Sequence, residues 1–206
     1  MNVIAIISQK GGAGKTTLAL HLAVAAERDG QATAIIDLDP QSSATGWGDS
    51  RASEAPAVVS AQAARLPKLL DAARANGVRY VFIDTAPHSE SAALAAARAA
   101  DFILIPCRPA ILDLRAIKES IDLAKLAEKP AAVVLNAVPP RGALAQDAED
   151  AVRGYDIPII PVHIGQRAAL QHALTAGQTA QEYEPTGKAA EEITQLYQWL
   201  KARVGT

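Results

Sequence analysis

Short apolar runs alternate with longer stretches rich in alanine and leucine along most of the chain of 206 residues. The apolar runs contain few polar residues at alternate positions, which is typical of parallel strands that are buried on both faces of a sheet. The pattern predicts strands at residues 3–7, 32–36, 80–83, 102–105, 131–135 and 158–162, with a short strand at 58–59.

The stretches between these runs have the spacing of amphipathic or buried helices. They predict helices at residues 16–28, 61–76, 91–99, 112–128, 143–153, 168–175 and 188–203. Alternation of strands and helices favours an α/β fold, with a doubly wound, mostly parallel sheet that is flanked by helices on both faces. Because no linker, low-complexity tract or internal repeat is visible, we expect one domain over residues 1–206.

Residues 9–17, between the first strand and the first helix, read Gln-Lys-Gly-Gly-Ala-Gly-Lys-Thr-Thr. Glycines let the backbone curl so that its N–H groups face phosphate oxygens, and the helix N-terminus adds unpaired donors. Lys15 is placed to reach the β- and γ-phosphates, and the Thr16 hydroxyl to coordinate Mg²⁺. The alternative is a glycine-rich turn with solvated lysines, which the strand-to-helix context disfavours. The predicted phosphate-binding residues are Gly11, Gly12, Ala13, Gly14, Lys15, Thr16 and Thr17.

Two other strands end in carboxylates. Asp37 and Asp39 follow the strand at 32–36, and Asp84 follows the strand at 80–83. Since ligands of such sheets bind beyond the carboxyl ends of the strands, these side chains are expected to face the phosphates. Asp84 has the Walker B form, in which an aspartate holds the shell of a Mg²⁺ ion, here through water. A plain turn or cap role is the alternative for Asp37 and Asp39.

The P-loop departs from the common pattern, because Gln9 stands where the first glycine is expected and Lys10 follows it. This arrangement resembles the deviant Walker A motif of the ParA/MinD family of P-loop ATPases. The resemblance implies ATP or ADP with Mg²⁺ as ligands and a dimer that forms on ATP binding. It also implies that Lys10 reaches across the dimer interface to the nucleotide of the other subunit.

The resemblance extends to Asp-Leu-Asp-Pro-Gln at residues 37–41 and to residues 84–87. It implies that Asp39 orients the attacking water, although which of Asp37 and Asp39 does so stays open. It further implies supporting or switch roles for a second group of residues, namely Asp37, Pro40, Thr85 and Pro87.

The second half of the chain resembles the family less closely. In the family, an asparagine at the position of Asn136 reads the adenine base, since an amide both donates and accepts; a turn-forming asparagine is the alternative. Pro161 and Val162 would line the adenine through backbone contacts. Asp113 fits a helix-start segment of the family, although a carboxylate that only favours the helix start is the simpler interpretation.

The short length and the lack of an N-terminal DNA-binding extension resemble the small ParA class that includes ParF. That class implies hydrolysis of ATP to ADP and phosphate under stimulation by a centromere-binding adaptor of the ParB or ParG kind, with segregation of plasmid or chromosomal DNA. Positioning of a protein cargo and MinD-like cycling on membranes are the alternatives. Arg167 and Lys188 are the first candidates for contacts with non-specific DNA.

Composition limits these alternatives. A formal net charge of −2 gives no global attraction to nucleic acid, so DNA binding needs a local patch. One cysteine, Cys107, excludes an internal disulfide and a cysteine-based zinc cluster. Without a signal peptide or a long apolar run, we expect a cytoplasmic protein that is associated with the nucleoid when ATP is bound. The apolar stripe on the last helix is predicted to dock on the sheet rather than on a membrane.

Overall fold

A single sheet of six parallel strands, in the order β3-β2-β4-β1-β5-β6, forms the centre of the computed structural model, which describes residues 1–204. The sheet confirms the predicted doubly wound fold, and residues 205–206 of the expected domain lie outside the described part. The strands are β1 (Asn2–Ile6), β2 (Thr33–Asp37), β3 (Ala57–Ser60), β4 (Tyr80–Asp84), β5 (Phe102–Cys107) and β6 (Ala131–Leu135).

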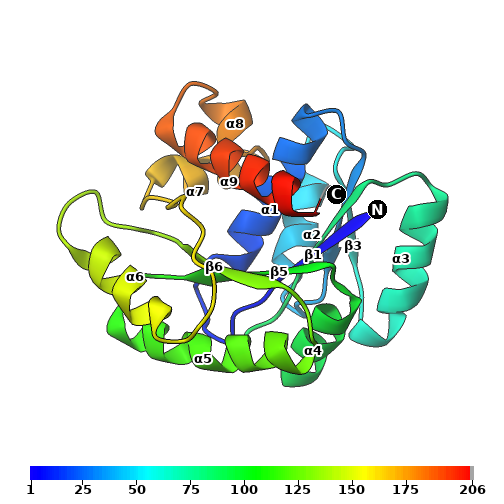
Figure 1. Cartoon of the computed structure of the whole chain (residues 1–206). Coiled ribbons are helices and arrows are strands. Elements are labelled where there is room, and N and C mark those ends of the chain that lie inside the picture. The colour runs from blue at the N-terminus through cyan, green and yellow to red at the C-terminus, as the bar shows by residue number, and fades with distance from the viewer. Residues whose placement is uncertain (205–206) are drawn as a thin grey trace.

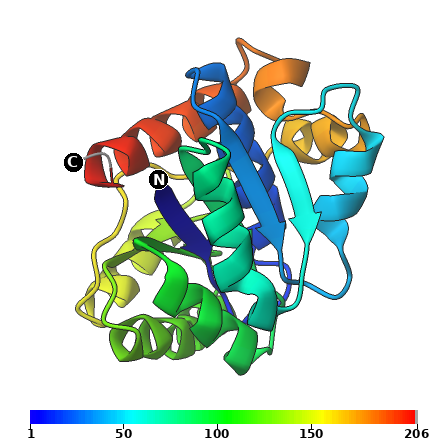
Figure 2. The ribbon, with the colours of Figure 1, turned by 90° about the vertical axis from the view of Figure 1, so that its right-hand side faces the viewer.

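Helices cover both faces of the sheet (Figure 1 and Figure 2). One layer packs around the first helix and comprises α1 (Lys15–Arg28), α2 (Ser43–Ser50), α7 (Ala168–Thr175), α8 (Ala180–Tyr183) and α9 (Lys188–Val204). The other comprises α3 (Leu66–Ala75), α4 (Glu90–Ala99), α5 (Ile111–Leu126) and α6 (Leu144–Arg153), with a short 3₁₀ turn at Ala63–Arg65. All predicted helices are present, and only the short helices α2 and α8 were not predicted from the sequence.

Two apolar cores, one on each face, hold the layers together. Successive strand residues point to opposite faces, so Ile4 and Ile6 of β1 enter one core while Val3 and Ala5 enter the other. This two-sided burial explains why the strands are apolar without alternation.

The last helix docks as predicted. Ile193, Leu196 and Leu200 of α9 are fully buried, and the ring of Tyr197 meets that of Tyr80 edge-on with centroids 6.0 Å apart. The apolar stripe of α9 therefore belongs to the core. None of the helices within residues 1–204 is both long enough and apolar enough to cross a bilayer.

The prediction of a strand at residues 158–162 is wrong. This segment runs beside β6 but forms only an isolated bridge, between Ile159 and Val133. Pro158 and Pro161 have no N–H to donate. The N–H of Ile160 bonds to Val133 and that of Ile164 to Leu135, so four steps along the segment match two along β6 and the ladder is interrupted.

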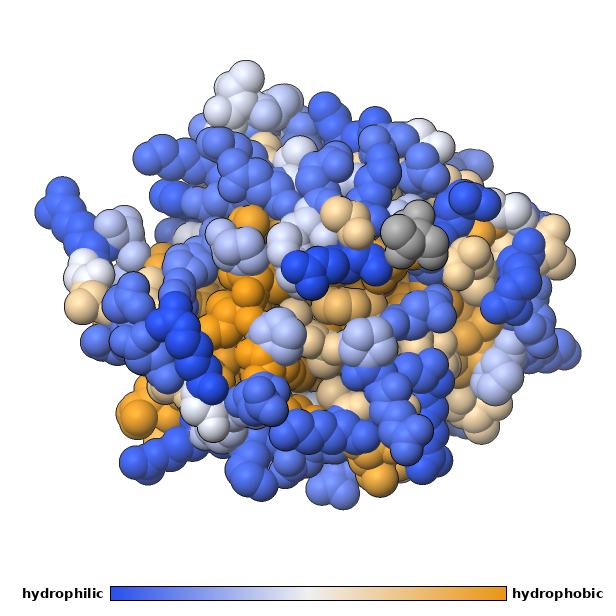
Figure 3. Space-filling model, viewed as in Figure 1, coloured by the Kyte–Doolittle hydropathy of each residue, from blue (hydrophilic) through white to orange (hydrophobic). Residues whose placement is uncertain are grey.

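Apolar side chains reach the surface over β6, as the space-filling view shows, while most of that face is hydrophilic (Figure 3). Ala131 at the start of β6 and Ile159 in the neighbouring segment are only partly buried. The irregular segment thus covers this edge of the sheet incompletely.

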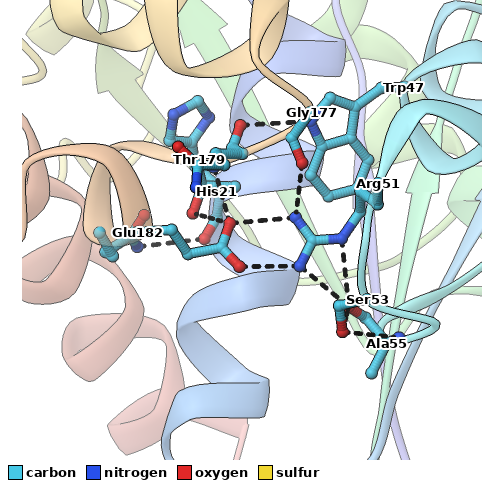
Figure 4. Close-up of polar contacts among 10 residues, drawn as sticks. His21, Trp47, Arg51, Ser53, Ala55, Gly177, Thr179 and Glu182 are labelled. Atoms are coloured by element: carbon cyan, nitrogen blue, oxygen red, sulfur yellow. Dashed lines mark hydrogen bonds and ion pairs between the residues drawn. The ribbon is translucent and has the colours of Figure 1, made fainter.

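A buried arginine fixes the end of α2 against α8 and the turn before it (Figure 4). The side chain of Arg51 is 4% exposed; it pairs with Glu182 at 2.8 Å and donates to the carbonyl oxygens of Gly177 and Ala55. Its guanidinium lies 4.5 Å from the ring centroid of Trp47, whose indole N–H donates to Gln178. Although burial acts in the opposite direction, hydrogen bonds from Arg51 and Thr179 hold the pKa of Glu182 below its usual value.

We expect Arg51→Ala to lower the free energy of unfolding by about 2–4 kcal/mol, since it removes the charged partner of Glu182 and a hydrogen-bond donor to the carbonyl groups of Gly177 and Ala55. Urea denaturation followed by circular dichroism measures this. The matched control is Arg74→Ala, which removes an exposed ion pair with Asp71 and should change stability little. Equal effects of the two substitutions would contradict the structural role assigned to Arg51.

Candidate nucleotide-binding site

The candidate site lies at the carboxyl ends of β1, β2 and β4. Strand order reverses at β1, which pairs with β4 on one side and with β5 on the other. Ligands of open α/β sheets bind at such a switch point. The loop at residues 7–14 leaves β1 at this place and leads directly into α1.

Two glycines give the P-loop its shape. Gly12 and Gly14 have φ values of +73° and +96°, in the left-handed region that favours glycine. A Cβ atom at Gly14 would lie 2.1 Å from the Asn136 amide nitrogen, so a side chain at this position would displace that amide. Because Gly14 immediately precedes α1, the unpaired N–H groups of the first helical turn lie next to the loop.

Lys15, the first residue of α1, is buried beneath the loop. Its ammonium group lies 3.4 Å from the Lys10 carbonyl oxygen. Burial lowers the pKa of Lys15, and the nearby carboxylates of Asp84 and Asp39 oppose this shift. The structure thus brings Lys15 together with two of the three predicted carboxylates, Asp84 and Asp39, while Lys10 itself is partly exposed.

Asp84 and Thr16, the two residues predicted as Mg²⁺ ligands, are hydrogen-bonded to each other. The Thr16 hydroxyl donates to Oδ2 of Asp84 at 2.6 Å, while Oδ1 is buried without a partner within the described chain. Burial, together with the nearby Asp37 and Asp39, raises the pKa of Asp84 to about 7. A buried carboxylate oxygen without a donor, beside a hydroxyl, fits a hard cation that prefers oxygen ligands.

Asp37 is fully buried, and Thr45 and Asp39 occupy its oxygens. Oδ2 accepts from the N–H and hydroxyl of Thr45 in α2, and Oδ1 accepts from the N–H of Asp39. Asp39 is partly exposed, and within residues 1–204 its Oδ1 accepts only from the N–H of Gln41. Asp37 therefore shapes the loop. Of the two carboxylates, Asp39 accepts fewer hydrogen bonds. Pro40 follows it as an exposed turn residue.

The remaining predicted residues flank the same edge. Thr85 is buried and its hydroxyl donates to the Ile6 carbonyl, so it ties β4 to β1; Pro87 follows in the loop before α4. The Asn136 amide donates to the Ala13 carbonyl at 2.7 Å, a contact with the P-loop that neither sequence interpretation anticipated. Pro161 is exposed and Val162 half-buried, in the segment beside β6.

Arg167 and Lys188 are the two candidate DNA contacts. Arg167 pairs with Glu192, one turn into α9, and Lys188 is exposed as the first residue of that helix. Sequence reasoning missed Thr45 and Arg51, because their roles depend on partners that cannot be recognised from spacing. It also assigned no role to Arg108, whose Nε donates to the buried Asp113 at 3.1 Å.

Comparison with known proteins agrees with this geometry. Residues 4–180 match the family model of the CobQ/CobB/MinD/ParA nucleotide binding domain. The chain belongs to this family. It is an ATPase of the MinD/ParA type.

Individual relatives have different roles. The chain is 35% identical over 199 residues to Maintenance of carboxysome distribution protein A of Gloeobacter kilaueensis, covering 95% of this chain and 90% of the relative. It is 27% identical over 240 residues to the chromosome-partitioning ATPase Soj of Thermus thermophilus, with coverage of 98% and 96%. Its fold is similar to that of the septum site-determining protein MinD from Pyrococcus horikoshii, solved with Mg-ADP (TM-score 0.79, 21% identity, coverage 99% and 97%).

We expect Lys15→Ala to weaken binding of MgATP and of MgADP by roughly tenfold to a hundredfold, because a charged donor to the phosphates is lost.

Lys10→Ala should bind both nucleotides within about threefold of the native affinity, but should fail to form the ATP-dependent dimer. Isothermal titration calorimetry and sedimentation velocity measure these effects. Sedimentation of Lys10→Ala like the native chain in ATP would exclude the role of Lys10 across the interface.

Proposed function

We propose that this ATPase positions a large protein cargo by cycling between an ATP-bound dimer on DNA and a released form. Support comes from the relative that acts in carboxysome distribution, since it has higher identity than the partition ATPase over a similar share of the chain. The sequence alone placed DNA segregation first and cargo positioning second, and the comparisons favour the reverse order.

The site residues suggest how the cycle would work. The P-loop and Lys15 hold the polyphosphate, Thr16 and Asp84 hold Mg²⁺, and Asp39 orients the attacking water. When bound, Mg²⁺ neutralises charge on the phosphates. Lys10 contributes to the site of the other subunit, so dimerisation and nucleotide state become linked. Loss of the γ-phosphate removes contacts with the loops that follow β2 and β4 and lets the dimer separate.

Segregation of plasmid or chromosomal DNA is the second candidate function, in which a centromere-binding adaptor of the ParB or ParG kind would stimulate hydrolysis. It is supported by the partition ATPase among the relatives. MinD-like membrane cycling has less support, because the apolar stripe of α9 is buried in the core and does not face outward as an anchor.

Deletion of the gene distinguishes the two candidates. If the cargo is a protein assembly, fluorescence microscopy should show clustered or unevenly inherited assemblies, while plasmid and chromosome loss stay at the level of the parent strain. A rise in DNA loss with normally distributed assemblies would contradict cargo positioning and favour partition.

The native chain should retain random-sequence duplex DNA with ATP, but not with ADP or without nucleotide, and high salt should weaken retention. The double variant Arg167→Ala and Lys188→Ala should bind DNA more weakly. The slope of its log binding constant against log salt concentration should be shallower by about one unit per lost phosphate contact. Lys68→Ala with Arg74→Ala on α3 is the matched control. Full retention by the Arg167 and Lys188 variant would remove these residues as DNA contacts.

A further inference from the structure

Arg108 lies next to the P-loop although it comes from a different strand. It follows β5, which is the neighbour of β1 in the sheet. Its Nη2 atom lies 3.3 Å from the position that a Cβ atom at Gly12 would occupy. The guanidinium therefore approaches the exposed tip of the loop, and a side chain at residue 12 would crowd it.

A buried carboxylate holds this guanidinium from behind. Nε of Arg108 donates to Oδ1 of Asp113 in the first turn of α5 at 3.1 Å. The side chain of Asp113 is 8% exposed, whereas that of Arg108 is 39% exposed. One edge of the planar fork is thus anchored, and the other edge faces the loop and solvent.

The Nη groups, at the other edge of the fork, carry N–H donors that have no acceptor within residues 1–204. A guanidinium carries five N–H groups, and only Nε of Arg108 has a hydrogen-bond acceptor within residues 1–204. Arginine forks bind phosphate oxygens through two parallel N–H groups. A fork that is oriented by one carboxylate and has two free Nη groups beside a P-loop is preorganised for a second anion.

We propose that Arg108 is a phosphate-contacting residue of this site, whose Nη groups bind the terminal phosphate of ATP held by the P-loop of the same chain. Asp113 is then a positioning residue that aims the guanidinium. The inference rests on ATP binding at the P-loop and does not depend on whether the cargo is protein or DNA. The competing explanation is a purely structural ion pair that fixes the turn between β5 and α5.

The two explanations differ in nucleotide selectivity. Since ADP lacks the terminal phosphate, Arg108→Gln should weaken MgATP binding by about tenfold and leave MgADP binding within about twofold. Asp113→Asn should cause a smaller loss of ATP affinity, because an amide oxygen still accepts from Nε. Arg108→Lys should recover only part of the affinity, since an ammonium cannot bridge Asp113 and a phosphate in the same way.

Calorimetric titrations with MgATP and MgADP provide the test, at protein concentrations where sedimentation shows one oligomeric state throughout. Arg115→Gln removes the same charge from an exposed position on α5 and is the matched control, with native affinities expected. Urea denaturation of each variant reports any loss of folding separately. Unchanged affinity for both nucleotides in Arg108→Gln, or equal losses for both, would overturn the proposal and leave Arg108 as a structural residue.

Discussion

The concentration of buried negative charge at one edge of the sheet is the constraint on which the site depends. Asp37 and Asp84 end adjacent parallel strands in direct register and are both fully buried, and Asp39 lies close by. Like charges at such positions are costly unless cations or donors compensate them. Lys15 supplies one cation, Thr16 and Thr45 supply donors, and one oxygen of Asp84 is left for a further positive partner. The free-energy cost of this arrangement is what a bound Mg²⁺–nucleotide would relieve.

The surrounding contacts hold the flexible parts of the site from several directions. Asn136 at the end of β6 fixes the P-loop through Ala13, and Thr85 joins β4 to β1. Thr45 connects Asp37 to α2, whose end is fixed in turn by Arg51. The loop after β2 is therefore held at both ends, by the carboxylate it surrounds and by the helix it leads into.

Much of this arrangement was predictable from local sequence. Buried parallel strands are recognisable as uninterrupted apolar runs. Residues 9–17 predict the P-loop because the backbone freedom of the glycines and the charge of the lysines are local properties of the sequence. The prediction at residues 158–162 failed because an apolar run does not reveal that two prolines and two extra residues prevent a continuous ladder. The roles of Arg51 and Arg108 could not be identified, since their partners, Glu182 and Asp113, are brought next to them only by folding of the chain. Asn136 was singled out for the adenine, and its contact with the P-loop backbone depends on a proximity that sequence does not contain.

Hydrogen–deuterium exchange with MgATP, with MgADP and without nucleotide tests whether the carboxyl edge of β1, β2 and β4 binds the nucleotide and senses its terminal phosphate. We expect slower exchange at residues 9–17 with either nucleotide, because the loop amides donate to the phosphates shared by both. We expect additional protection at residues 37–45 and 84–89 with MgATP alone. Protection that is the same for both nucleotides at these two loops, or that lies away from this edge of the sheet, would contradict nucleotide sensing at this edge.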